Sequence, residues 1–370
     1  MKSLTEEHLS FLSRFGFDPE LFESWRKAVR DGSLSLENNE VTGQLLAPAP
    51  DQIRSLPRED SEDRQELFEI GKAAIANGEF GVVILNGGMA TRFGGVVKGT
   101  VDVVGETSFL GLKLHDVRRA EKTCGGTIPV MLMNSFATDE ATTAHCREHE
   151  WFGLPKEQVD HFTQFISVRL DEKGNIFEPE KGQISPYGPG HGDFSFALRH
   201  SGLLQRFLEN GGKYLMLQNV DNLGARVSPA ILGHHIQNRA EITCECAPKW
   251  PGDVGGSPFV LDGKLQLVEQ LRFPAGFDPD IVDVFNTNTF HFSASSIDRD
   301  FELGWYYVEK AVGDRKAIQI ERLVGELTKH LKSNFVRVKR TGDGTRFLPI
   351  KTPDDLESAR DEVRELYDEP

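Results

Sequence analysis

The stretch Phe80-Gly81-Val82-Val83-Ile84-Leu85-Asn86-Gly87-Gly88 decides the fold class, because an apolar run rich in β-branched residues passes directly into a glycine turn. Such a run is typical of a strand buried on both faces of a parallel sheet. Similar runs recur at 128–133 and 214–217, with a helical stretch at 194–208 between them. The alternation predicts an α/β sheet with helices on both faces. In such sheets, ligands bind beyond the carboxyl ends of the strands.

The segment before this strand predicts helices. Apolar residues recur at helical spacing near the start of the chain, and the Ala47-Pro48-Ala49-Pro50 stretch interrupts the pattern as a linker. A second helix is expected from Ser61 to Asn77, because Ser61 can cap its first turn and Gly78 can end it. Near the other end of the chain, Thr352 and Pro353 predict the cap and first residue of a terminal helix.

Composition excludes several classes of protein. The chain has 370 residues, 42 Lys and Arg against 57 Asp and Glu, and a net charge of −15, which disfavours nucleic-acid binding. No apolar run approaches the roughly 20 residues that span a membrane, and the first residues lack the apolar region of a secretion signal. Four cysteines are too few for a disulfide framework, so a cytoplasmic protein is expected.

The loop after the first strand carries the features of a phosphate site. Small residues at 87–88 and 94–95 let backbone N–H groups approach anionic oxygens, and Arg92 and Lys98 add positive charge. The loop matches neither the dinucleotide-binding fingerprint nor the P-loop pattern. A glycine-rich turn with solvated cations is the alternative, and the pattern favours the phosphate site.

Other strand ends and loops add candidate ligand contacts. His191 lies between two glycines in a loop rich in glycine and proline, where a ligand contact and a structural role are equally consistent with the sequence. Asn219 and Asp221 follow the strand at 214–217, and a carboxylate there suits Mg²⁺ shared with phosphate oxygens. A helix-capping turn is the alternative for Asp221. Spacing alone favours a solvated side chain for Lys351.

Six segments in order resemble the UDP-glucose pyrophosphorylase (UTP–glucose-1-phosphate uridylyltransferase) family and its sister UDP-N-acetylhexosamine pyrophosphorylases. Each segment is a weak signal, but their shared order from about residue 80 to 356 is specific. The segments are Leu85-Asn86-Gly87-Gly88, Leu132-Met133-Asn134-Ser135-Phe136 with Thr138-Asp139-Glu140, Pro189-Gly190-His191-Gly192-Asp193, Asn219-Val220-Asp221-Asn222-Leu223-Gly224-Ala225, Phe285-Asn286-Thr287-Asn288 and Arg346-Phe347-Leu348-Pro349-Ile350-Lys351-Thr352.

The resemblance implies a nucleotide-diphospho-sugar transferase fold, with a Rossmann-like, mostly parallel mixed sheet. It implies three parts: an N-terminal helical segment at 1–75, a nucleotidyltransferase catalytic domain at 76–340, and a short C-terminal segment at 341–370 with Lys351 and a terminal helix. The C-terminal β-helix domain of the family is not expected in full, and the oligomeric state stays open. The implied reaction converts UTP and a sugar 1-phosphate into UDP-sugar and pyrophosphate, with Mg²⁺.

The resemblance also implies roles for individual residues. The expected nucleotide contacts are Leu85, Asn86, Gly87, Gly88, Gln164, Gly190 and Asn219, the first four through backbone atoms. The expected sugar or phosphate contacts are His191, Gly256, Glu269, Asn286, Asn288 and Glu321. Asp221 would hold the metal ion, and the expected catalytic residues are Arg92, Lys98 and Lys351. The reaction needs no general base, because a sugar phosphate is already an anionic nucleophile, so catalysis rests on positioning and charge neutralisation.

Departures from the family pattern leave alternatives open. The loop reads Gly88-Met89-Ala90-Thr91-Arg92, closer to the N-acetylhexosamine enzymes, and no lysine directly precedes Gly255-Gly256. Glucose 1-phosphate is the expected substrate, and N-acetylglucosamine 1-phosphate or galactose 1-phosphate is the alternative. A catalytically silent protein that binds nucleotide sugars is the alternative from another class.

Overall fold

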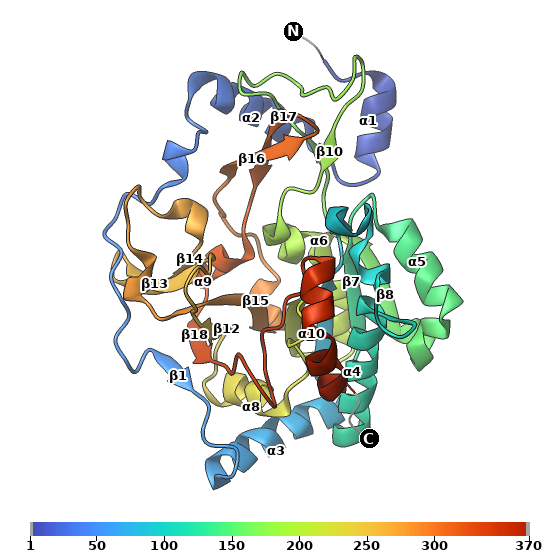
Figure 1. Cartoon of the computed structure of the whole chain (residues 1–370), viewed down its shortest axis with the longest axis vertical. Coiled ribbons are helices and arrows are strands. Elements are labelled where there is room, and N and C mark those ends of the chain that lie inside the picture. Colours follow the sequence, from blue (N-terminus) through green and yellow to red (C-terminus); the bar gives the residue numbers. More distant parts are fainter. Residues whose placement is uncertain (1–2, 368–370) are drawn as a thin grey trace.

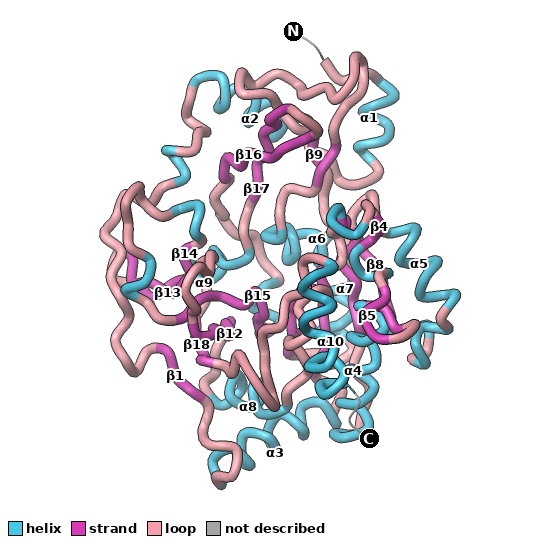
Figure 2. The backbone as a smooth tube through the Cα atoms, in the orientation of Figure 1, coloured by secondary structure: helices cyan, strands magenta, loops and turns pink. Residues whose placement is uncertain are grey.

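The computed structural model describes residues 3–367, with the main chain alone at Ala90 and Thr91, and its centre is one eight-stranded sheet (Figures 1 and 2). β15 runs antiparallel to its two neighbours, and every other adjacent pair in this sheet is parallel. The predicted mostly parallel mixed sheet is confirmed. In spatial order the strands are β1 (Ile53–Ser55), β18 (Ser333–Arg337), β12 (Ile242–Pro248), β15 (Val284–Ser293), β11 (Tyr214–Asn219), β2 (Phe80–Leu85), β7 (Val130–Asn134) and β8 (Val159–Thr163).

Helices flank the sheet, and short hairpins extend from it. The α-helices are α1 (Glu6–Ser13), α2 (Pro19–Asp31), α3 (Glu62–Ala76), α4 (Phe109–Cys124), α5 (Asp139–Glu148), α6 (Phe194–His200), α7 (Leu203–Glu209), α8 (Pro229–Gln237), α9 (Leu327–His330) and α10 (Pro353–Tyr367). The hairpins are β3 (Met89–Ala90) with β4 (Val96–Val97), β5 (Asp102–Val104) with β6 (Thr107–Ser108), β9 (Ser167–Val168) with β10 (Pro186–Tyr187), β13 (Ser257–Leu261) with β14 (Lys264–Val268), and β16 (Tyr306–Val312) with β17 (Arg315–Glu321).

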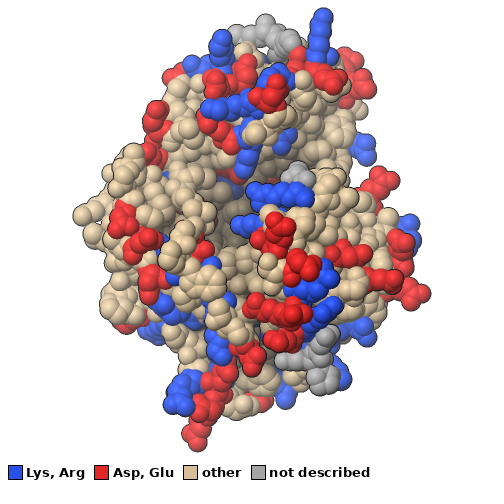
Figure 3. All heavy atoms as spheres, in the orientation of Figure 1, with Lys and Arg blue, Asp and Glu red and all other residues tan. Residues whose placement is uncertain are grey.

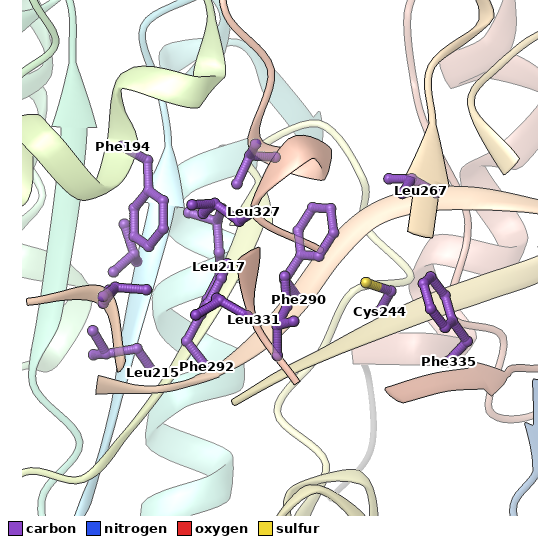
Figure 4. Packing of buried hydrophobic residues seen from close by; sticks show 14 of the residues in the cluster. Phe194, Leu215, Leu217, Cys244, Leu267, Phe290, Phe292, Leu327, Leu331 and Phe335 are labelled. Carbon is purple, nitrogen blue, oxygen red and sulfur yellow. The ribbon is translucent and has the colours of Figure 1, made fainter. Parts of the chain in front are cut away.

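Alternate side chains of the central strands supply two hydrophobic cores. Val83 and Leu217 point to the core that α6, α7 and α9 cover, together with aromatic residues such as Phe290 and Phe292 (Figure 4). Val82 and Met216 point to the opposite core, which α3, α4, α8 and α10 cover. Because successive side chains of a strand point to opposite faces, an unbroken apolar run is what a sheet covered on both sides requires.

Local signals account for the element boundaries. α3 begins after Ser61, whose hydroxyl accepts a hydrogen bond from the N–H of Arg64, and it ends before Gly78 at φ 72°. The helix predicted over 194–208 is wrong as a single element. Gly202 adopts φ 77° between α6 and α7, a left-handed conformation that interrupts an α-helix. α10 begins at Pro353, and the Thr352 hydroxyl accepts a hydrogen bond from the N–H of Asp355 at 3.0 Å, as expected.

The N-terminal segment is not purely helical, since β1 forms one edge of the main sheet. α1 and α2 pack through Leu12, Phe22 and Trp25 onto a separate core that includes Ile318 and Ile320 of β17. Figure 1 shows this group above the sheet, across from α3 and α8. Within residues 3–367, no helix is long and apolar enough to cross a membrane. The four cysteines are free and buried.

Candidate active site

A cleft of about 320 Å³ opens where β2, β7 and β11 end together. Leu85 pairs with Asn219 on one side and Met133 on the other, so the three strands bring their carboxyl ends to one edge. Figure 3 shows this face hollowed near its centre, with basic side chains at the rim. The cleft is lined by nine residues predicted from the sequence, namely Leu85, Gly87, Gly88, Lys98, Gln164, Gly190, His191, Asn219 and Asp221.

Glycines allow Gln164 to lie against the main chain of two loops. A Cβ on Gly87 would lie 2.9 Å from Gln164 Nε2, and one on Gly188 would lie 2.1 Å from the same atom. Any side chain at either position would therefore displace Gln164 from the cleft. Asn86 points away from it, because its Nδ2 donates to Asn134 Oδ1 and to Thr142 Oγ1, both at 2.9 Å. Its side chain fixes the loop, so a ligand contact is left to its backbone.

Lys98 brings positive charge to the cleft from the end of the glycine-rich loop. Its N–H donates to the carbonyl of Gly88 at 3.1 Å, and its Nζ lies over the rings of Phe93 and Phe109 at 4.3 and 4.9 Å. Burial lowers the pKa of Lys98, and attraction to Asp221 opposes that shift. Repulsion from Arg92 and Lys351 also lowers the pKa of Lys98. The three predicted cations are therefore close enough to interact electrostatically.

Lys351 reaches the cleft because the C-terminal segment pairs with the loop after β11. The N–H of Ile350 donates to the carbonyl of Asp221 at 3.0 Å, and the N–H of Leu223 donates to the carbonyl of Leu348 at 3.0 Å. The side chain of Lys351 is exposed, and its N–H is held by Asp355 Oδ2 at 2.8 Å. The side chain of Lys351 is solvated, as its spacing in the sequence predicts. The main-chain pairing between the C-terminal segment and the loop after β11 nevertheless places it beside the cleft.

Asp221 is a partly buried carboxylate faced by cations. Burial raises the pKa of Asp221, while Lys98 and Lys351 oppose that rise. Among the described residues, no group of three or more His, Cys, Asp or Glu side chains could hold a metal ion. A single carboxylate suits Mg²⁺ only where phosphate oxygens and water complete the coordination. The residues present therefore fit a metal ion shared with a bound nucleotide.

His191 presents a hydrogen-bond donor to the cleft. Its Nδ1 accepts from the N–H of Val324 at 3.1 Å, and burial lowers its pKa to about 4. The ring is therefore neutral near pH 7, with its proton on Nε2. The loop is held by an ion pair of 2.5 Å between Asp193 and Arg322, and the Arg322 guanidinium lies 3.8 Å from the Phe196 ring centroid.

The predicted sugar contacts form a chain of hydrogen bonds that begins at the cleft. Asn288 Nδ2 donates to Asn219 Oδ1 at 2.9 Å, and Asn286 Oδ1 accepts from the N–H of Asn288 at 3.0 Å. The N–H of Asn286 donates to the carbonyl of Gly256 at 2.8 Å. Burial raises the pKa of Glu269 to about 7, and hydrogen bonds from Asn286 and Gly256 oppose that shift.

Glu321 lies on the other side of this region. A Cβ on Gly190 would come within 3.2 Å of Glu321 Cβ, so the side chain stands next to the His191 loop. Burial raises the pKa of Glu321, and Lys310, whose Nζ lies 3.6 Å from Glu321 Oε1, opposes that rise. Glu321, Gly256, Glu269, Asn286 and Asn288 adjoin the cleft without lining it.

Lys113 is a residue of the site that sequence reasoning missed. It is fully buried in α4, and its Nζ donates to Gln218 Oε1 at 2.7 Å, Asn222 O at 2.5 Å and Ala225 O at 2.7 Å. These bonds fix the loop that carries Asp221. Its signal in the sequence was a charged residue inside an apolar helical stretch, Phe109-Leu110-Gly111-Leu112-Lys113-Leu114.

A family model described as UTP–glucose-1-phosphate uridylyltransferase matches residues 40–368. The chain belongs to this family. A family member, the UTP–glucose-1-phosphate uridylyltransferase of Pyrus pyrifolia, is 30% identical over 339 residues, which cover 87% of this chain and 67% of that protein. The chain spans from 56% to 67% of the length of the curated relatives it matches.

Solved structures share the family fold. The UDP-N-acetylglucosamine pyrophosphorylase of Trypanosoma brucei has a TM-score of 0.78 at 22% identity, over 97% of this chain and 79% of that one. The UDP-glucose phosphorylase of the same organism has a TM-score of 0.75 at 22% identity, over 92% and 74%. The predicted nucleotide-diphospho-sugar transferase fold is confirmed.

Proposed function

We propose that this chain catalyses the reaction of UTP with a sugar 1-phosphate, most directly glucose 1-phosphate, to give UDP-sugar and pyrophosphate. One observation carries the proposal. Lys98 and Asp221 line one cleft where three parallel strands end, and main-chain pairing of Ile350 with Asp221 brings Lys351 beside them, although these residues are far apart in the sequence. Lys98 in the cleft, with Arg92 and Lys351 close enough to affect its pKa, suits a strongly anionic substrate in a protein of net charge −15. Membership of the family supports the same reaction.

The chain's residues serve positioning and charge neutralisation. The phosphate of the sugar attacks the α-phosphorus of UTP in line, the new P–O bond forms, and the bond to pyrophosphate breaks. Lys98, Lys351 and Arg92 would neutralise charge that develops on the phosphate oxygens. Gln164 and the Gly87-Gly88 main chain would hold the uracil, and the Nε2–H of His191 would donate to a phosphate or sugar oxygen.

Mg²⁺ is the proposed metal ion, with Asp221 as its protein ligand. A bound divalent cation would neutralise phosphate charge and help to orient the nucleotide. Asp221 is the expected ligand because it is partly buried at the strand end, with no histidine or cysteine cluster among the described residues to favour another metal.

The sugar is the least constrained part of the proposal. Asn286, Asn288 and Glu269 offer amide and carboxyl groups suited to sugar hydroxyls, which glucose, galactose and N-acetylglucosamine all carry. Glucose 1-phosphate is proposed because the matching family model carries that name. The N-acetylglucosamine alternative is supported by the likeness in fold to the Trypanosoma brucei enzyme.

A comparison of kcat/KM across sugar 1-phosphates tests the assignment. Purified protein is assayed with UTP, Mg²⁺ and the 1-phosphates of glucose, galactose and N-acetylglucosamine. The highest kcat/KM is expected for glucose 1-phosphate. A higher value for another sugar 1-phosphate would identify that sugar as the preferred substrate of the same reaction. Binding of UDP-glucose without turnover of any sugar would identify a silent nucleotide-sugar-binding protein and refute the proposed reaction.

A further inference from the structure

A second cavity, of about 590 Å³, lies between α3, α8 and the carboxyl ends of β12 and β18, in the lower part of Figure 1. It shares no lining residue with the candidate active site. Its lining holds seven Lys or Arg side chains and one carboxylate, Glu59. The chain as a whole carries a net charge of −15, so its average composition does not explain this excess of Lys and Arg side chains around one cavity.

Most of these cations are oriented by acidic partners. Arg346 makes a two-pronged ion pair with Glu245, at 2.8 and 2.6 Å. Lys339 lies 2.7 Å from Glu59. A guanidinium has five N–H donors in a fixed plane, so a cation held on one edge still presents donors on another. Glu245 and the carbonyl of Arg226 accept three hydrogen bonds from Arg346, which leaves two of its five N–H donors for another partner.

Arg64 differs from the others, because its guanidinium is partly buried and makes no hydrogen bond within residues 3–367, while its main-chain N–H donates to Ser61. Burial lowers the pKa of Arg64, attraction to Glu59 opposes this, and repulsion from Arg346 adds to it. Burial also lowers the pKa of Arg226. Attraction to Asp116 opposes this shift, and repulsion from Arg119 and Arg346 adds to it. Cations that repel one another at a partly desolvated wall would be stabilised by an anion between them.

We propose that this cavity is a second ligand site, which binds a small phosphorylated anion between Arg64, Arg226 and Arg346. Its volume falls within the roughly 300–1,000 Å³ typical of small-molecule sites. Guanidinium groups match phosphate oxygens in geometry and charge. Ser228, which caps α8, and Ala230 in its first turn also line the cavity, so the helix N-terminus adds its partial positive charge there. The site does not depend on the proposed reaction.

The site is linked to the active site through one short segment. Arg346 lines the cavity, and its carbonyl accepts from Asn222 Nδ2 at 3.3 Å. Four residues later, the N–H of Ile350 bonds to Asp221, and Lys351 follows. A ligand held by Arg346 therefore acts on the segment that positions Lys351, and we expect it to slow amide hydrogen exchange over residues 346–350.

Calorimetric titration without divalent metal tests the proposal, with inorganic pyrophosphate and glucose 1,6-bisphosphate as probes. Four proteins are compared: wild type, Arg64→Gln, Lys351→Ala and Arg360→Gln. Arg64→Gln removes a guanidinium that makes no hydrogen bond in the described structure and keeps the main-chain N–H that Ser61 accepts. The fold should therefore persist, and the melting temperature checks this. Arg360→Gln removes the same charge from exposed α10 and serves as the matched control.

At least one probe is expected to bind wild type, with a Kd at least tenfold weaker in Arg64→Gln, the scale of one charge-assisted hydrogen bond. Arg360→Gln should retain that binding. Lys351→Ala removes a cation of the candidate active site, so the part of the binding that depends on Arg64 should remain in this variant. Binding of the bisphosphate alone would identify an organic phosphate as the ligand, and binding of both probes would point to the phosphate group itself. The proposal is overturned if neither probe binds, or if Lys351→Ala weakens binding and Arg64→Gln does not.

Discussion

Replacing Lys351 distinguishes a catalytic role from a structural role more clearly than replacing any other predicted site residue. Its side chain is exposed, yet its position beside Asp221 is fixed by main-chain pairing of its own segment. Replacing the side chain therefore removes charge from the cleft without removing packing. Lys98, by contrast, lies against Phe93 and Phe109, so its replacement would disturb both charge and contact.

Lys351→Ala is expected to lower kcat by at least about 100-fold, as loss of one charge-stabilising group typically does. The melting temperature should stay close to that of wild type. Lys122→Ala, at an exposed position of α4, is the matched control and should leave both quantities unchanged. Turnover like that of wild type in Lys351→Ala would show that the lysine is a solvated side chain.

His191 should act as a neutral donor, not as an acid or base. Because its pKa is lowered to about 4, it gains no proton between pH 6 and 8, and the activity profile there should show no inflection from this residue. His191→Ala should reduce kcat/KM roughly tenfold to 100-fold, the loss expected for a hydrogen bond to a charged oxygen. His191→Gln should recover part of the loss. An inflection near pH 6.5 that disappears in His191→Gln would contradict this role.

At the scale of elements, the loop after β11 depends on α4. Lys113→Met leaves the carbonyls of Asn222 and Ala225 without their partner, at a cost of about 1–3 kcal/mol for each buried group. The free energy of unfolding in urea should fall by about 3 kcal/mol. Lys122→Met makes the same exchange on the exposed side of the helix and should change stability little. An equal effect in both variants would show that Lys113 does not hold the loop.

The elements themselves were predictable where their signals are local. The apolar runs, the Ser61 cap and the Thr352-Pro353 start are each read within a few residues, and each is found in the structure. The break at Gly202 was missed, because apolar periodicity continues through it and a single glycine is tolerated in many helices. Lys113 was missed for a different reason, since its acceptors lie more than a hundred residues away.

At the scale of the whole molecule, acid should weaken the fold through buried histidines. His235 and His234 are buried residues of α8, and burial lowers their pKa values to about 3 and about 4, respectively. Below about pH 6.5 the unfolded chain binds protons that the folded chain does not, so stability falls as the pH drops from 6.5 toward 4. The slope is about 1.4 kcal/mol per pH unit for each such histidine.

Urea unfolding at pH 7.5, 6.5 and 5.5 measures this slope. His235→Gln should reduce it, and His200→Gln, at an exposed position of α6, should not. Glu269, whose pKa is raised to about 7, acts in the opposite direction in both proteins, so the difference between wild type and His235→Gln carries the test. An unchanged slope in His235→Gln would contradict the assignment.

The proposed function requires that three segments distant in the sequence form one nucleotidyl-transfer site. Release of pyrophosphate from UTP and glucose 1-phosphate, measured with Mg²⁺ in wild type and Lys351→Ala side by side, tests it most directly. We expect release by wild type that requires both substrates and that falls at least about 100-fold in the variant. No release by wild type with any sugar 1-phosphate, while UDP-glucose still binds, would contradict it.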